Sequence, residues 1–306
     1  MTTEHPTIDL SGPASRLKRE RRVRRVFWGA ALVSVFISVL IIGSRVGEAW
    51  NFIRTVPFGS LFDIGWFPRR GLFDIKTVVT GTLLIAGIAM LIATPLGLGA
   101  AIYLSEYATP RSRRILKPML EMLAGIPSVV LGYFALTWLS PNLVQKISSA
   151  GVFSMAAAGI GVGILVTPLV ASVSEDAMRA VPYGLREASY GLGARKVTTA
   201  TRVVFPAAIS GIVASLILGI SRAIGETMVV AMAAGAVGGS LFQMNVFEPG
   251  QTMTAAMTAL AIGSDQVAGS GNAFQSLFFL GLLLFLITLA LNIASERIVR
   301  RVREKY

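Results

Sequence analysis

Two residues of opposite charge, Arg222 and Glu226, stand four positions apart in an otherwise apolar stretch that reads SRAIGETM from 221 to 228. On a helix, side chains four positions apart lie on one face. A guanidinium can bind an oxyanion through two parallel hydrogen bonds. We therefore expect Arg222, Glu226 and the adjacent Thr227 to line a solute path, with Glu226 partly neutralising Arg222 so that the anion can be released.

The alternative for this pair is a purely structural role. If the stretch crosses a membrane, each charge costs at least about 2.5–3.5 kcal/mol at the bilayer centre. That cost is tolerated when the charge is paired or faces a watery cavity. A static Arg–Glu pair that fixes helix packing would meet the first condition.

A second group of residues lies in the segment 186–206, which reads REASYGLGARKVTTATRVVFP. One interpretation of this segment is a short helix, a glycine bend at Gly193 and a second short helix. Such a helix–bend–helix unit would protrude from the protein as a knob. An ordinary amphipathic helix beside a membrane is the alternative.

The sequence lacks the motifs of common enzyme and nucleotide sites. The stretch at 191–196, GLGARK, has no glycine directly before its lysine and so does not match a phosphate-binding P-loop. Patterns such as HExxH and GxSxG do not occur. There are no cysteines, and the one histidine, His5, lies in a polar tail. We expect a protein that is not an enzyme, has no cofactor and binds no metal.

The elements that must position these residues are membrane helices. The chain is 54% hydrophobic and only 14% charged, whereas soluble domains carry about 25% charged residues. A spanning helix needs about 20 mostly apolar residues. Six stretches meet this requirement, and they cover 26–43, 77–105, 122–145, 147–174, 207–237 and 266–295. The apolar segment 252–263 is too short to span and is expected to be interfacial or re-entrant.

The positions of the lysines and arginines predict the orientation. With six spans, 21 of the 28 Lys and Arg residues fall on one side and six on the other, and Arg222 lies in the membrane. Basic residues concentrate on cytoplasmic loops. Both termini and the 186–206 segment should therefore be cytoplasmic, and the net charge of +12 needs no nucleic-acid partner.

These observations divide the chain into five parts. Residues 1–25 should be a disordered basic tail in the cytoplasm, and 26–45 a first helix that is retained as an anchor instead of being cleaved as a signal peptide. Residues 46–75 should be extracytoplasmic, 76–295 the transport unit, and 296–306 a second cytoplasmic basic tail. Pro95, Pro127 and Pro168 fall inside spans, where each removes a backbone hydrogen bond and favours a kink.

Several stretches resemble a known family. Glu187, Ala188 and Gly193, followed by Pro206, are similar in spacing to the EAA signature of ABC importer permeases, with Ser189 in place of the second alanine. The stretches 95–107, 123–130 and 222–228 resemble the phosphate-specific permeases of bacterial ABC importers, and the tracts at 210–212 and 286–292 favour a PstC-like over a PstA-like subunit. The resemblance covers roughly residues 70–300.

The resemblance implies an all-α integral membrane protein with six transmembrane helices and the type I ABC importer permease fold. It implies that Glu187, Ala188, Gly193 and Pro206 dock an ATPase dimer, and that Arg222, Glu226 and Thr227 lie on the path of inorganic phosphate. The other implied partners are a PstA-like second permease and an extracytoplasmic phosphate-binding protein, in the lipid of the cell inner membrane. The alternatives are a permease for another oxyanion, such as molybdate or sulfate, an ion-coupled secondary transporter or channel working alone, and a membrane enzyme.

Overall fold

The computed structural model describes residues 14–236, 238–262 and 271–302. The chain divides into two units, Met1–Glu48 and Ala49–Tyr306. In the first unit the structure describes residues 14–48, which form the first part of one long helix. Three predicted segments lie outside the described residues: the start of the N-terminal tail (1–13), the beginning of the sixth span (266–270) and the last residues of the C-terminal tail (303–306). Val237, the predicted end of the fifth span, also lies outside them.

Helices make up most of the described chain. The α-helices are α1 (Ala14–Thr55), α2 (Ile75–Ile102), α3 (Pro110–Ala124), α4 (Ser128–Phe134), α5 (Gln145–Ile147), α6 (Met155–Arg179), α7 (Tyr183–Gly191), α8 (Lys196–Thr199), α9 (Phe205–Ala207), α10 (Ile209–Ile224), α11 (Met228–Ala233), α12 (Met253–Ile262) and α13 (Gly271–Val302). Wider π-helical turns are η3 (Tyr103–Tyr107), η4 (Ala135–Val144) and η5 (Ala200–Val204), and 3₁₀ turns are η1 (Phe58–Phe62) and η2 (Pro68–Arg70).

A small antiparallel sheet is an addition to the predicted all-helical architecture. Strand β1 (Gly65–Phe67) lies between β2 (Leu72–Phe73) and β3 (Ser240–Leu241). Trp66 pairs with Phe73 across one edge and with Ser240 across the other. The turn between β1 and β2 ends at Gly71, whose φ of 76° suits glycine. The sheet thus joins the segment before α2 to the segment after α11.

The centre of the Ala49–Tyr306 unit is the pairing of α2 with α6, the most extensive contact between two helices. Small residues line it, among them Ala86, Ala89 and Ala93 of α2 and Ala158 of α6, all buried. Without a hydrophobic effect between helices in lipid, close backbone approach through small residues provides the packing energy. The interface therefore depends on the glycines and alanines of both helices.

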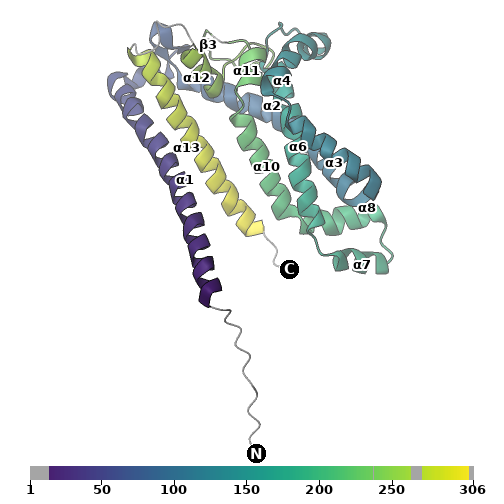
Figure 1. Cartoon of the computed structure of the whole chain (residues 1–306). Coiled ribbons are helices and arrows are strands. Elements are labelled where there is room, and N and C mark those ends of the chain that lie inside the picture. The colour runs from purple at the N-terminus through teal and green to yellow at the C-terminus, as the bar shows by residue number, and fades with distance from the viewer. Residues whose placement is uncertain (1–13, 237, 263–270, 303–306) are drawn as a thin grey trace, which may run out of the picture. The chain divides into compact units, whose positions relative to one another are not determined.

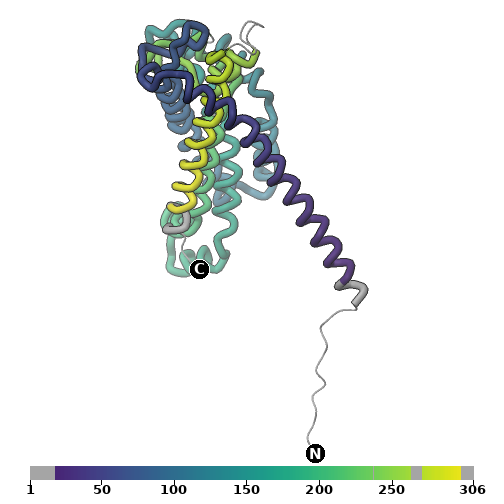
Figure 2. The backbone as a smooth tube through the Cα atoms, turned by 90° about the vertical axis from the view of Figure 1, so that its left-hand side faces the viewer, coloured from purple at the N-terminus to yellow at the C-terminus, as the bar shows by residue number. Residues whose placement is uncertain are grey.

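The two ends of this unit carry different elements. Figure 1 shows α6, α10 and α13 running side by side, with the strands, α11 and α12 gathered at one end. The α7–α8 segment lies at the other end, together with the C-terminal end of α13, and Figure 2 shows the same arrangement from a second direction. The predicted knob and the C-terminal end of α13 therefore share one end of the bundle.

The number of candidate spans is compatible with the predicted six. Four helices are long and apolar enough to cross a membrane alone, and the number is six if each of two bent helix pairs counts as one span. The bend between Pro110–Ala124 and Ser128–Ile147 is 88° and contains Pro127, as the sequence predicted. Pro95 and Pro168 instead lie within continuous helices. Helix α12 has ten residues, so it is too short to span, as expected.

Several predicted boundaries are wrong. Helix α1 begins at Ala14, so the tail is helical, not disordered, from that residue onward. The predicted fourth span starts at Met155 instead of 147, because the Ser154 side chain caps the helix by accepting a hydrogen bond from the Ala157 amide. The predicted fifth span, 207–237, is not continuous: it is interrupted after Ile224 and resumes at Met228.

The tight α2–α6 contact yields a stability prediction. A methyl group added at Gly159 would lie 2.7 Å from Ile88 Cβ, whereas one added at Gly87 would have nothing within 4 Å. We expect Gly159→Ala to lower the free energy of unfolding by about 1–3 kcal/mol through overpacking, and Gly87→Ala to leave it unchanged or slightly higher. The measurement is the thermal midpoint of the purified protein in detergent. Equal midpoints for the two variants would contradict this packing.

Candidate functional site

The predicted path residues lie at a break in the backbone. Helix α10 ends at Ile224, the Gly225 amide donates to the Ser221 carbonyl over 3.2 Å, and α11 starts at Met228. Arg222 is therefore in the last turn of α10, while Glu226 and Thr227 are in the break. The expectation that Arg222 and Glu226 share the face of one helix is wrong, although the two side chains remain in contact across the helix end.

Glu226 is engaged with the backbone that follows it. Its carboxylate oxygen Oε1 accepts hydrogen bonds from the amides of Met228, at 3.2 Å, and Val229, at 3.4 Å. Its own carbonyl oxygen accepts from the Thr254 hydroxyl at 2.8 Å. The side chain is only 4% exposed. The Glu226 carboxylate thus accepts from the first amides of α11. Without it, these amides would have no partner, because the helix is broken before them.

Arg222 is in the opposite situation. Its side chain is 55% exposed, and the guanidinium nitrogen Nη2 lies 3.8 Å from Glu226 Oε2. That distance is too long for a hydrogen bond. No hydrogen bond to another described residue occupies the guanidinium, so its donors are available to an oxyanion. The neighbouring Ser221 donates to Asn292 Oδ1 at 3.0 Å, which ties this end of α10 to α13.

The predicted docking residues lie in an exposed loop. Glu187 and Ala188 are exposed on α7, and Gly193 follows the end of that helix with a φ of 78°. The Gly193 amide donates to the Tyr190 carbonyl at 2.9 Å. A left-handed residue after a helix end is the position where glycine is favoured. The structure thus brings Glu187, Ala188 and Gly193 together in a helix–bend–helix unit, and places Pro206 further along, exposed in α9.

Apolar side chains project from the same loop. Leu192 is 90% exposed and Tyr183 is 69% exposed, and Val197 is exposed beside them. Exposed apolar side chains grouped with charged ones are typical of a protein–protein interaction site.

Sequence reasoning missed Arg186, which fixes this loop to the helices. Its guanidinium donates to Glu106 Oε1 at 2.9 Å, to the Met178 carbonyl at 2.9 Å and to the Val181 carbonyl at 2.8 Å. The Arg186 side chain is 11% exposed and that of Glu106 is 5% exposed. One residue therefore joins α7 to the end of α6 and to η3. No local pattern could have revealed the pair, because 80 positions separate its members.

A second buried carboxylate, Glu175, was also missed. It is fully buried in α6 and receives hydrogen bonds from Arg113, at 2.9 Å, and Lys117, at 2.7 Å, both on α3. Arg179, one turn along α6, lies 3.7 Å away. This cluster connects α3 to α6 near the end of the bundle that carries the loop. Among the described residues, no group of three or more His, Asp or Glu side chains could hold a metal ion.

Residues 93–304 match the family described as binding-protein-dependent transport system inner membrane component. The chain is 31% identical to the Bacillus subtilis (strain 168) protein named probable ABC transporter permease protein YqgH, with 94% of each chain covered. It is 30% identical to the Pasteurella multocida (strain Pm70) phosphate transport system permease protein PstC, with 89% of this chain and 90% of that one covered.

Solved structures show the same fold at lower identity. A chain of a bacterial alginate ABC transporter, in complex with an alginate pentasaccharide-bound periplasmic protein, is 17% identical and superposes with a TM-score of 0.64 over 94% of this chain and 98% of that one. A chain of the MetNI methionine ABC transporter in an inward-facing conformation is 19% identical, with a TM-score of 0.54 over 75% of this chain and 94% of that one. The fold is therefore that of a type I ABC importer permease.

The Arg186 contacts yield a prediction about the loop. Replacing Arg186 with alanine leaves the Glu106 carboxylate buried without its partner, a change that costs about 3–5 kcal/mol in comparable sites. We expect faster hydrogen–deuterium exchange of the backbone amides in Tyr183–Gly191, because α7 loses its tie to α6 and η3. Arg195→Ala, an exposed residue of the same loop, is the control and should change nothing. If both variants exchange at the wild-type rate, Arg186 does not hold the loop.

Proposed function

This chain belongs to the family of binding-protein-dependent transport system inner membrane components, and on that premise we propose that it is the PstC-type permease subunit of an ATP-driven importer of inorganic phosphate. The observation that supports phosphate as the substrate is sequence similarity. The chain is about 30% identical, over most of both chains, to several proteins named PstC of phosphate transport systems. The exposed cation at the break, Arg222, supports it, since a guanidinium binds tetrahedral oxyanions.

The loop around Gly193 is the proposed contact with an ATPase dimer. Glu187, Ala188 and Gly193 form the protruding part, and Pro206 lies where the chain returns to the bundle. The exposed apolar side chains of Tyr183, Leu192 and Val197 would be covered in the complex. Arg186 would then pass movements of the loop to α6 and η3 through its hydrogen bonds. The remaining proposed partners are a PstA-like permease and an extracytoplasmic phosphate-binding protein.

The proposed orientation places both termini and the loop in the cytoplasm. The excess of basic residues on that side of the predicted topology supports it. The arrangement of the Ala49–Tyr306 unit is compatible, because α7, α8 and the C-terminal end of α13 lie at one end (Figures 1 and 2). The small sheet and α12, at the other end, would then face the extracytoplasmic side.

Arg222, Glu226 and Thr227 are the proposed path residues. Arg222 would attract the anion into the membrane, where a charged solute is otherwise excluded. Glu226 lies close enough to lower the affinity of Arg222 for the anion, while its carboxylate keeps the break in α10–α11 satisfied. Weak binding is needed because the solute must leave on the other side. A transporter of this kind alternates between two conformations, and ATP binding and hydrolysis shift the equilibrium between them.

The docking proposal predicts that the bend at Gly193 is needed for assembly. A side chain at a φ of 78° costs about 1–2 kcal/mol in the left-handed region, so Gly193→Ala should weaken retention of the ATPase subunit about 5–30-fold. Gly191→Ala, at the end of α7 with open space around it, is the matched control. The measurement is the amount of ATPase subunit that copurifies with the tagged permease from detergent extracts. Equal copurification from the two variants would argue against docking at this bend.

The path proposal predicts a loss of transport when the cation is removed. Arg222→Gln should lower phosphate uptake by the reconstituted importer at least about tenfold, because a charge-assisted hydrogen bond of about 1.5–3 kcal/mol is lost. Lys146→Gln, an exposed cation in α5, should transport normally.

A double variant separates the path role from a static ion pair. If Arg222 and Glu226 only hold helices together, removing both charges in Arg222→Gln/Glu226→Gln should restore uptake, since no unpaired charge remains. If Arg222 binds the anion, the double variant stays inactive. Normal uptake by Arg222→Gln alone, with normal assembly, would overturn the path role.

A further inference from the structure

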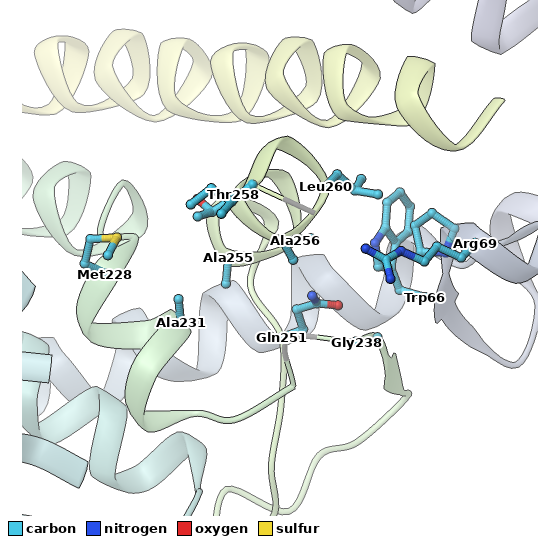
Figure 3. A pocket seen from close by; sticks show the side chains of 14 residues that line it. Trp66, Arg69, Met228, Ala231, Gly238, Gln251, Ala255, Ala256, Thr258 and Leu260 are labelled. Atoms are coloured by element: carbon cyan, nitrogen blue, oxygen red, sulfur yellow. The ribbon is translucent and has the colours of Figure 1, made fainter. Parts of the chain in front are cut away.

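A pocket of about 400 Å³ lies at the end of the bundle that carries the small sheet. Figure 3 shows Trp66 and Arg69 at one end of it, Met228 and Ala231 at the other, and the Gln251 side chain between them beneath α12. Most of its wall is apolar. Its polar side chains come from three separate segments: Arg69 between β1 and β2, Gln251 before α12, and Thr258 within α12.

Gln251 is a buried polar group without a partner. The residue is 3% exposed, and its amide oxygen Oε1 has no hydrogen-bond partner among the described residues. A buried acceptor that is left unpaired is unfavourable unless a ligand or water satisfies it. In Figure 3 the Gln251 amide projects into the space between α12 and the Trp66–Arg69 end. The pocket therefore offers an unused acceptor at its centre.

The backbone holds Gln251 in place. A methyl group at Gly81 of α2 would lie 2.3 Å from the Gln251 carbonyl oxygen, so the glycine permits a direct contact between the two segments. The Met253 amide donates to Thr82 Oγ1 at 3.0 Å, and the Ala255 amide donates to Thr252 Oγ1 at 3.2 Å. The backbone of Gln251 is thus fixed between α2 and the start of α12.

Arg69 supplies an available cation. It is exposed, and no hydrogen bond or ion pair joins its guanidinium to the other described residues. The next residue, Arg70, differs, because its guanidinium lies over the Phe67 ring at 5.5 Å and it does not line the pocket. A cation and an acceptor in the same pocket suit an anion that also carries a proton.

We propose that this pocket binds hydrogen phosphate before the anion reaches Arg222, an inference that rests on the proposed function. Arg69 donates hydrogen bonds to the charged phosphate oxygens, and Gln251 Oε1 accepts the hydrogen bond of the P–OH group. Sulfate at neutral pH has no proton to donate, and the phosphodiester of a lipid headgroup has none either. With Oε1 facing the pocket, as in this structure, the acceptor favours protonated phosphate over both.

The pocket adjoins the break in the α10–α11 span. Met228, the first residue of α11, lines the pocket, and its amide is bound by the Glu226 carboxylate. Thr254, in the α12 turn that also carries Ala255 and Thr258, donates to the Glu226 carbonyl. The wall of the pocket is thus part of the same hydrogen-bonded unit as the break, so an anion released from the pocket along α11 would meet Arg222.

Direct binding to the importer tests the proposal. The complex of both permeases and the ATPase dimer, without the binding protein, is placed in nanodiscs of neutral lipid and titrated with inorganic phosphate while tryptophan fluorescence is recorded. Trp66 lines the pocket, so phosphate should change the signal, and Trp66→Phe should remove that change. Sulfate should bind at least about tenfold more weakly. A flat titration of the wild-type complex would overturn the site.

Matched variants assign the roles. Arg69→Gln and Gln251→Met should each weaken phosphate binding about tenfold or more. Arg70→Gln should not, and neither should Gln275→Met, which removes another buried amide oxygen without a partner that lies outside the pocket. Thermal midpoints are measured for all four, because loss of binding with an unchanged midpoint separates a ligand contact from a structural one. Unchanged phosphate affinity in Arg69→Gln and Gln251→Met would refute the assignment.

Two further measurements identify the ligand and distinguish a failure of this inference from a failure of the proposed function. If nanodiscs that contain phosphatidylglycerol abolish the phosphate response, the pocket takes a lipid headgroup and the proposal is wrong. Phosphate uptake is measured in parallel with the complete wild-type importer. Uptake with no phosphate binding in the pocket would defeat only this inference, whereas failure of the complete importer to take up phosphate would defeat the proposed function.

Discussion

The main constraint on this protein is that backbone amides and carbonyls inside a bilayer must find partners within the protein. Regular helices meet the requirement by themselves. This chain departs from regular helix after Ile224, inside the predicted span 207–237, and the departure is stable because Glu226 accepts from the Met228 and Val229 amides while Thr254 donates to the Glu226 carbonyl. A buried carboxylate is thus used to restart a helix.

The same principle explains the attachment of the loop at the other end of the bundle. Helix α6 ends at Arg179, where its last carbonyls lack helical partners. Arg186 donates to the carbonyl of Met178 and to that of Val181, and it pairs with Glu106 as well. A single guanidinium therefore terminates one helix and anchors another. At both ends, side chains that complete the backbone hydrogen bonding also connect elements that must move together in a transporter.

The sequence predicted features that depend on composition and local spacing. The number of spans, the kink at Pro127 and the bend at Gly193 follow from apolar length, from the missing amide of proline and from the freedom of glycine. The helix start at Met155 and the break after Ile224 were missed, because the apolar character of 147–174 and 207–237 is uniform and does not show where hydrogen bonding changes. The Arg186–Glu106 and Arg113–Glu175 contacts join segments far apart in the sequence, which no single-sequence pattern reveals.

Arg222 and Glu226 differ in exposure and in hydrogen bonding, and this difference bears on their proposed role in the path. Had the two side chains formed a close ion pair on one helix, each would have neutralised the other and left little attraction for an anion. The break instead turns Glu226 toward the α11 amides, and the Arg222 guanidinium, at 3.8 Å, keeps its donors available. The carboxylate remains near enough to weaken the field of the cation. In the proposed path role, an exposed guanidinium whose field is weakened by a nearby carboxylate lets a solute both enter and leave.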